Sequence, residues 1–123
     1  MTKQWTICED EQLSKVKTES ELALPILKNP PELNHFAEFF KALGDETRLQ
    51  IIGLLMMQDM CLCEITSALD AASSTINHHL KLLERGQVIS SRREGRFTVY
   101  HLNDSKMIKT LVNEVKKEGT EHV

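Results

Sequence analysis

DMCLCEITSALDAASSTINHHLKLLERGQVISSRREGRFTVYHL is residues 59–102 of this 123-residue chain, and most of the architecture follows from it. Apolar residues at spacings of three and four predict a helix over about 62–69 and a second over about 73–85. The intervening residues 70–72 are too few for anything but a tight turn. Gly86 is expected to end the second helix.

Beyond Gly86 the apolar period changes from that of a helix to two, which is the period of a half-buried strand. Strands are therefore predicted over 88–93 and 97–102, joined as a hairpin around Glu94-Gly95-Arg96. Two helices linked by a short turn match the geometry of a helix-turn-helix. A hairpin directly after them adds a wing, so the predicted fold is mainly α with a small β-hairpin (α+β), a winged helix-turn-helix.

Further helices flank this core. They are predicted over about 9–17, 31–43, 46–57 and 104–118. Asp45 is the expected N-cap of the third of these, Ser73 or Ser74 caps the helix over 73–85, and Asn103 or Asp104 caps the last. Pro25, Pro30 and Pro31 mark a linker. The expected organisation is an N-terminal arm and linker over 1–31, a winged helix-turn-helix domain over 32–118, and a tail over 119–123.

Two of the flanking helices predict a dimer. The helix over 32–43 carries an apolar stripe of Leu33, Phe36, Ala37, Phe40 and Leu43, and the last helix carries Met107, Ile108, Leu111, Val112 and Val115. Broad apolar faces on a soluble chain often mark an interface. The alternative is that both helices simply pack on their own core. The helix over 46–57 is apolar on most sides, so we expect it to lie centrally.

The overall charge is unfavourable for nucleic-acid binding, but its distribution is not. The formal net charge is −3, yet residues 78–101 hold five Lys or Arg against two Glu, a local charge of +3. A basic stripe on an acidic body is the electrostatic footprint of a DNA-binding surface.

The predicted second helix offers small polar groups that suit a major groove, and the wing offers arginines that suit phosphate or a minor groove. The candidate DNA-binding residues are Ser73, Ser74, Thr75, Asn77, His78, Lys81, Arg92, Arg93 and Arg96. Of these, Asn77 and His78 are expected to reach base edges, and the serines and lysine to hold phosphates. The alternative is an ordinary helical bundle with a solvated polar helix.

Chain length, hydrophobicity and cysteine content indicate the expected cellular compartment. The chain is one domain in size, and no apolar run reaches the roughly 18 residues of a membrane span. Its first residues lack the apolar region of a signal peptide, which favours a cytoplasmic protein. Thiols stay reduced there, so the three cysteines are not expected to form structural disulfides.

The pair Cys61 and Cys63 is a candidate site for a soft ion, because thiolates select such ions. On a regular helix residues two apart point about 200° away from one another, so both sulfurs face one ion only at a frayed first turn. Ion binding is therefore expected to distort the start of the helix over 62–69. Two sulfurs make an incomplete site, and Cys8 on the arm is the remaining cysteine. The alternative is that each cysteine is a small buried hydrophobe.

Three motifs in order resemble the ArsR/SmtB family of winged-helix repressors. FKALGDETRLQI (residues 40–51) is similar to its opening signature, SSTINHHLKLL (73–83) to its recognition helix, and residues 86–102 to its wing. The resemblance covers about residues 32–118. It implies a homodimer that binds a double-stranded operator, represses transcription and is released by an inducer.

The resemblance extends to the thiol site. MCLCEI (residues 60–65) is similar to the thiolate site of arsenic- and cadmium/lead-responsive members, and CEDE (8–11) to an arm that supplies ligands across the dimer. Gln4 stands where a second arm cysteine is expected. Three sulfurs, Cys8, Cys61 and Cys63, suit As(III), Sb(III) or Pb(II), with a slight preference for As(III)/Sb(III) over Pb(II)/Cd(II). The family's other metal site, on the last helix, is missing, because lysines replace its ligands after Asp104.

Two other classes of function compete. The first is a winged-helix regulator that answers redox state or a partner protein, since accessible thiols oxidise. The second is an enzyme, but a cysteine nucleophile needs an orienting base. The sequence shows no Cys-His-Asp order and no glycine-rich phosphate loop. A regulator that needs no cofactor to fold, with a thiophilic ion as its inducer, is the leading prediction.

Overall fold

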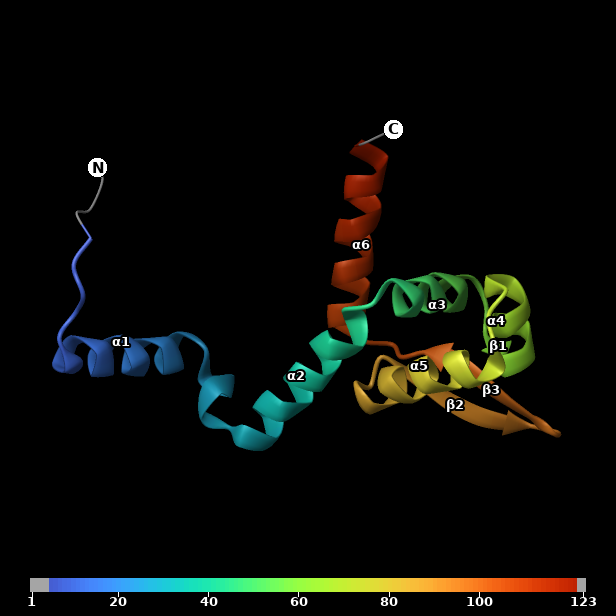
Figure 1. Ribbon diagram of the computed structural model, residues 1–123, viewed down its shortest axis with the longest axis horizontal. Coiled ribbons are helices and arrows are strands. Elements are labelled where there is room, and N and C mark those ends of the chain that lie inside the picture. Colours follow the sequence, from blue (N-terminus) through green and yellow to red (C-terminus); the bar gives the residue numbers. More distant parts are fainter. Residues whose placement is uncertain (1–4, 122–123) are drawn as a thin grey trace. The chain divides into compact units, whose positions relative to one another are not determined.

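The computed structural model describes residues 5–121, with side chains up to Lys116. Its elements, labelled in Figure 1, follow the chain as α1 Asp10–Ala23, the 3-10 helix η1 Pro25–Lys28, α2 Pro30–Leu43, α3 Glu46–Met57, β1 Met60–Cys61, α4 Leu62–Leu69, α5 Ser73–Arg85, β2 Ile89–Glu94, β3 Phe97–Leu102 and α6 Lys106–Glu121. The helix-turn-helix and the hairpin are confirmed with their predicted bounds, to within one residue.

The chain divides into two compact units, one ending at His35 and one beginning at Phe36. The first unit holds α1, η1 and the start of α2. Helix α1 begins with a capping box in which the Glu9 amide donates to the Gln12 side chain at 3.2 Å. The sequence predicted only residues 9–17 as helical here. The helix runs six residues further and ends before Pro25, where the proline ring fits the first turn of η1.

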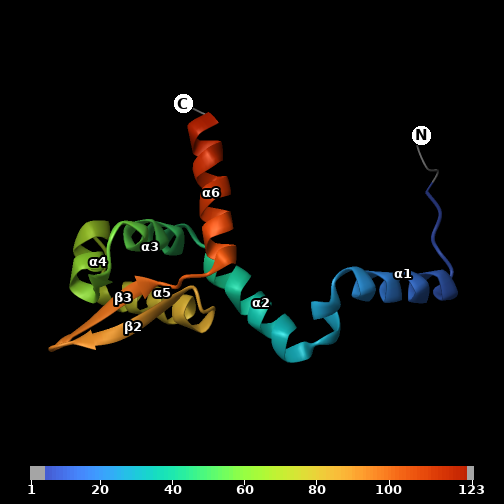
Figure 2. The ribbon, with the colours of Figure 1, turned by 180° about the vertical axis from the view of Figure 1, so that it is seen from behind.

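The second unit is built on a three-stranded antiparallel sheet in the order β1-β3-β2. The β2–β3 hairpin projects past the helices α3 to α5, which Figures 1 and 2 show from opposite sides. Side chains of α3, α4, α5 and the first sheet residues form the core. The fully buried large ones are Ile51, Ile65, Ile76, Leu80, Leu83, Val88 and Ile89. This core holds α5 against its neighbours and leaves its other face in solvent.

The short strand β1 is the main departure from the prediction. The sequence indicated only a frayed first helical turn at Cys61 and Cys63, but Met60 pairs with Tyr100 and Cys61 with Val99. Two residues are too short to give a period-two signal, and only pairing with β3 makes them a strand. Cys61 is thereby fixed to the wing on one side and to α4 on the other.

Helix α2 also differs from its predicted orientation. Phe39 and Ala42 are its buried residues, whereas Leu33 and Phe40 of the predicted stripe are 39% and 55% exposed. The reason lies in a contact with the end of α5, where a Cβ on Gly86 would lie 2.8 Å from the Ala42 Cβ. Close approach at Gly86 selects the face of α2 that carries Ala42.

Helix α3 is only partly central. It buries Ile51, Ile52 and Leu55, as an apolar helix should, but Leu49 and Met56 are exposed. These two face a groove beside α6. Within the last helix, Ile108 is buried and Val115 is 70% exposed.

Two predicted helix caps are wrong. Helix α5 has Ala72 at its N-cap with no side-chain hydrogen bond, so Ser73 and Ser74 lie within the first turn. Helix α6 is capped by Ser105, whose Oγ accepts from the Ile108 amide at 3.4 Å. The prediction of Asp45 as cap is confirmed, since its carboxylate accepts from the Arg48 amide at 3.1 Å.

Candidate functional site

The face of α5 that points away from the core carries the polar residues singled out in the sequence. Ile76, Leu80 and Leu83 are buried against the domain. All six candidates on this helix are exposed, namely Ser73, Ser74, Thr75, Asn77, His78 and Lys81. Because Ala72 is the cap, the hydroxyls of the first turn are not used by the N-cap hydrogen bond and are free to meet a ligand.

The wing presents two arginines at its tip. Glu94 pairs with Phe97 around a two-residue turn in which Gly95 has φ 62, the conformation a II′ turn requires at its first central position. The Arg93 guanidinium donates to Thr98 Oγ1 at 3.1 Å, and the Arg96 guanidinium lies 5.6 Å from the centre of the Phe97 ring. Neither makes an ion pair with a described carboxylate.

Arg92, the third predicted wing arginine, is occupied within the protein. Its Nη1 donates to Asp59 at 2.8 Å and its Nε to Glu94 at 3.0 Å. These carboxylates, Glu94 first, raise the pKa of the guanidinium. His101 Nδ1 also lies 3.4 Å from Arg92. The positive charge of the wing is therefore concentrated in Arg93 and Arg96.

The two cysteines of the helix-turn-helix face each other. Cys61 Sγ and Cys63 Sγ are 3.2 Å apart. Cys61 is the N-cap of α4 with extended backbone (φ −89, ψ 169), so its side chain does not follow the helical direction that would separate it from Cys63. The sulfurs already lie together, and the expected distortion of the helix is not needed. Cys61 is buried and Cys63 is exposed, so a ligand has access from one side.

Cys61 also closes the first turn of α4. Its amide donates to Glu64 Oε1 at 3.0 Å, as in a capping box. That hydrogen bond holds the pKa of Glu64 below its usual value. The hydrogen bond with Cys63 raises the pKa of the Cys61 thiol. An ion that binds both sulfurs must therefore displace the proton of the Cys61 thiol.

Among the residues that the structure describes, no third metal-binding side chain joins Cys61 and Cys63. Among the described residues no cluster of three or more His, Cys, Asp or Glu is placed to hold a metal ion. Cys8 belongs to the first unit, two residues before α1. Gln4 and His122 lie outside the described residues.

Sequence reasoning missed a buried polar contact beneath α5. Arg48 is 8% exposed, and its guanidinium donates to the carbonyls of Ala42 at 2.8 Å and Lys41 at 3.2 Å. Its Nη1 lies 3.0 Å from His79 Nδ1, and the Asp45 carboxylate lies 3.8 Å from the same nitrogen. The arginine thus joins the end of α2, the start of α3 and the middle of α5. Sequence shows only an arginine in a first helical turn, which is usually a solvated position.

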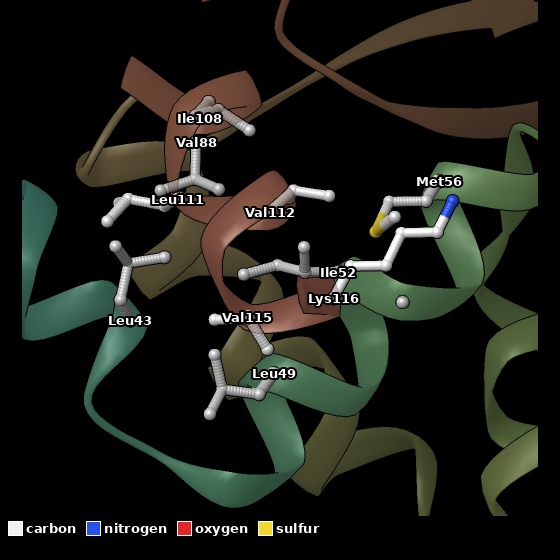
Figure 3. Close-up of a pocket in the computed structure, with 11 residues that line it drawn as sticks. Leu43, Leu49, Ile52, Met56, Val88, Ile108, Leu111, Val112, Val115 and Lys116 are labelled. Atoms are coloured by element: carbon white, nitrogen blue, oxygen red, sulfur yellow. The ribbon is translucent and has the colours of Figure 1, made fainter. Parts of the chain in front are cut away.

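An apolar groove runs between α3 and α6 (Figure 3). Its volume is about 480 Å³, and only Lys116 among its lining residues is charged. The exposed Leu49 and Met56 face it from α3, and Leu111 and Val115 from α6. A single copy of this unit leaves that surface uncovered.

Comparison with known proteins bears on these features. Residues 45–91 match the model of the bacterial regulatory protein, arsR family. An uncharacterized HTH-type transcriptional regulator of Methanocaldococcus jannaschii is 40% identical over 72 residues, which is 58% of this chain and 81% of that protein. The chain belongs to the ArsR/SmtB family. It is therefore a transcriptional regulator of winged helix-turn-helix fold, and the family's members are not enzymes.

Two further relatives are named as regulators of metal or metalloid resistance. A cadmium resistance transcriptional regulatory protein CadC homolog of Staphylococcus aureus is 34% identical over 69% of this chain and 68% of its own length. An arsenical resistance operon repressor of Bacillus subtilis is 32% identical over 61% of this chain and 72% of its own length.

Among solved structures, a homodimeric winged helix-turn-helix DNA-binding domain from Mycobacterium bovis superimposes with a TM-score of 0.67 and 30% identity. The superposition covers 78% of this chain and 91% of that one. In the part of this chain that the structure describes, no helix has the length and apolar character to cross a bilayer.

Proposed function

We propose that this ArsR/SmtB-family chain is a homodimeric repressor whose operator grip is released when a thiophilic ion binds Cys61 and Cys63, with Cys8 as third ligand. The observation that carries the proposal is the 3.2 Å approach of the two sulfurs at the joint between α4 and the sheet. Thiolates at this spacing select soft or thiophilic ions over Mg²⁺ or Ca²⁺.

DNA binding is assigned to α5 and the wing. Asn77 and His78 lie on the exposed face of α5, where they meet base edges in a major groove. Ser73, Ser74, Thr75 and Lys81 lie along the same exposed face to hold phosphates, and Arg93 and Arg96 extend the contact along the backbone. Arg92 reaches DNA only after leaving Asp59 and Glu94.

A homodimer places two such surfaces on one operator. The α3–α6 groove is the surface that a second copy would cover, because it is apolar and open in the single chain. Two-fold symmetry then sets the reading helices about one turn of DNA apart, which requires a pseudo-palindromic site.

The position of the sulfurs supplies a route for release. Cys61 pairs with Val99 of the wing and caps α4, which packs against α5. An ion that also binds Cys8 pulls the already adjacent Cys61 and Cys63 toward the arm, and this displacement reaches both DNA-facing elements. A coupling free energy of about 1–3 kcal/mol is typical of such linkage and corresponds to roughly 5- to 150-fold in affinity.

The number of sulfur ligands limits which ions fit the proposed site. Three thiolates suit the pyramidal geometry of As(III) or Sb(III), and also Pb(II), whereas Cd(II) requires a fourth donor. Similarity to both cadmium and arsenical resistance regulators supports this group of ions without separating its members.

The test is release of operator DNA by As(III), Sb(III), Pb(II) and Cd(II), with Mg(II) as a control ion. Cys61→Ser is a sharp variant, because serine is a preferred N-cap and keeps the start of α4 while removing the sulfur. We expect Cys61→Ser and Cys63→Ser to bind operator but to lose ion-induced release and sulfur-to-metal absorption. Operator complexes that withstand every ion would refute the ion-binding half of the proposal.

A second candidate function is redox sensing, and the same distance favours it. Sulfurs 3.2 Å apart need to close to about 2.05 Å to form a disulfide. The oxidant, a peroxide, would take up the two thiol hydrogens and two electrons, and would be reduced to two water molecules or, if organic, to an alcohol and one water. Cys8→Ser separates the two functions, since redox release would survive this substitution and ion-induced release would weaken.

A further inference from the structure

We infer that Arg48 and His79 are positioning residues for DNA reading, which seat α5 on the last turn of α2 at the angle that operator recognition needs. The inference rests on the proposed DNA-binding role of α5 and adds two residues that do not touch DNA. His79 is on the recognition helix, but its side chain is only 14% exposed and points to Arg48.

The chemistry of the contact fixes its direction. A guanidinium has donors only, so Arg48 donates to His79 Nδ1, which lies 3.0 Å from its Nη1. Other guanidinium nitrogens donate to the backbone carbonyls of Lys41 and Ala42, which lie at the C-terminal, negative end of the α2 dipole. A planar fork held by three acceptors from two helices leaves α5 little freedom to slide.

A second contact anchors the same face of α5. Gly86 lies seven residues, about two turns, after His79. A Cβ there would lie 2.8 Å from the Glu38 carbonyl oxygen and 3.2 Å from the Phe39 Cα, so the backbones of α2 and the end of α5 are in direct approach. Two attachment points on one helix define its angle, whereas one would allow it to pivot.

DNA reading is sensitive to that angle because hydrogen bonds to base edges weaken steeply with distance and misalignment. Phosphate contacts tolerate a small rotation, since charge attraction is less directional. Loss of the Arg48–His79 contact should therefore reduce binding to the operator more than binding to unrelated DNA. A purely structural role would lower stability and leave the ratio of the two affinities unchanged.

The experiment measures this ratio on full-length protein, using an operator selected by the wild type from a random-sequence pool and an unrelated duplex of equal length. His79→Leu removes the acceptor and His79→Gln retains one. Ile65→Val is the matched control, because Ile65 is fully buried in α4 and its truncation costs stability without touching the seat. Thermal unfolding of each variant is measured in parallel.

We expect His79→Leu to lower the specificity ratio by about tenfold, the worth of one good base contact, with His79→Gln within about threefold of wild type. Ile65→Val should lower the unfolding temperature and keep the ratio. An unchanged ratio in His79→Leu would overturn the inference. If His79→Leu does not fold, the specificity ratio is measured for Arg48→Lys, which keeps the positive charge but lacks the planar set of guanidinium donors. A wild-type ratio in Arg48→Lys would equally overturn the inference. A wild type without any operator preference would refute the proposed function itself.

Discussion

Asp45 has two contacts, one with the start of its own helix and one with a different helix. Its carboxylate caps α3 as its sequence position predicts, and it also lies 3.8 Å from His79 on α5. The hydrogen bond from the Arg48 amide, followed by the charge of the Arg48 guanidinium, lowers the pKa of Asp45. A carboxyl whose pKa is lower in the folded state stabilises the fold only when it is ionised.

The first prediction follows from that shift. The contribution of Asp45 to stability is complete above its unfolded pKa of about 3.9 and is lost as pH falls through its lower folded pKa. Asp45→Asn keeps a good N-cap but cannot titrate, so its stability should fall less steeply than that of wild type below about pH 4. Urea unfolding across that pH range measures the difference, and parallel curves would contradict the assignment.

The second prediction contrasts two glycines. Gly86→Ala forces a Cβ against Ala42 and Glu38, and overpacking of this kind costs roughly 1–3 kcal/mol. Gly53→Ala is the control, because it is in the middle of α3 with open space around the added Cβ within one copy. Both variants are made in a Val115→Glu background, so that the proposed dimer contact does not cover Gly53. The Gly53→Ala substitution should raise the free energy of unfolding by up to about 1 kcal/mol. Denaturant unfolding of both variants checks the opposite signs, and equal effects would argue against close approach at Gly86.

At the scale of elements, the wing is a three-stranded structure rather than a free hairpin. Strand β1 pairs with β3, and the Asp59–Arg92 ion pair links the residue before β1 to β2. Both contacts tie the wing to the segment that carries Cys61. The hairpin itself was predictable from its period and its glycine turn, but β1 was not, since pairing of Met60 with Tyr100 and of Cys61 with Val99 creates it.

The third prediction ranks the wing arginines. Arg96→Ala should weaken operator binding and reduce the slope of log affinity against log salt by about 1, the signature of one lost phosphate contact. Arg92→Ala should change both less, because Arg92 is already neutralised by Asp59 and Glu94. Binding isotherms at several salt concentrations test the ranking. A larger effect at Arg92 would mean that its ion pairs open on DNA.

At the scale of the whole molecule, the α3–α6 groove is the feature that a single copy of the second unit leaves open. Its lining side chains come from three helices and from Val88, and most are apolar. An apolar groove of this kind often marks an interface. We assign it to a second copy, in keeping with the proposed two-fold operator complex.

The fourth prediction tests that assignment. Val115→Glu puts a charge into the groove, and because a buried unpaired charge is costly we expect dimer dissociation to rise by at least about tenfold. Thr110→Glu adds the same charge to α6 at an exposed position outside the groove, and it should leave association unchanged. Sedimentation velocity over a range of concentrations distinguishes them. Equal dissociation of both variants would place the interface elsewhere.

Helices α3 to α5, the hairpin and the exposed polar face of α5 follow from the sequence, because periodicity, caps and glycine turns are local properties of the chain. The orientation of α2, the existence of β1 and the Arg48–His79 contact arise only in the folded molecule. Each of these depends on residues brought together from distant positions, and their energies are settled only when the core packs. The functional assignments of the individual DNA and ion contacts stay predictions that the experiments above address.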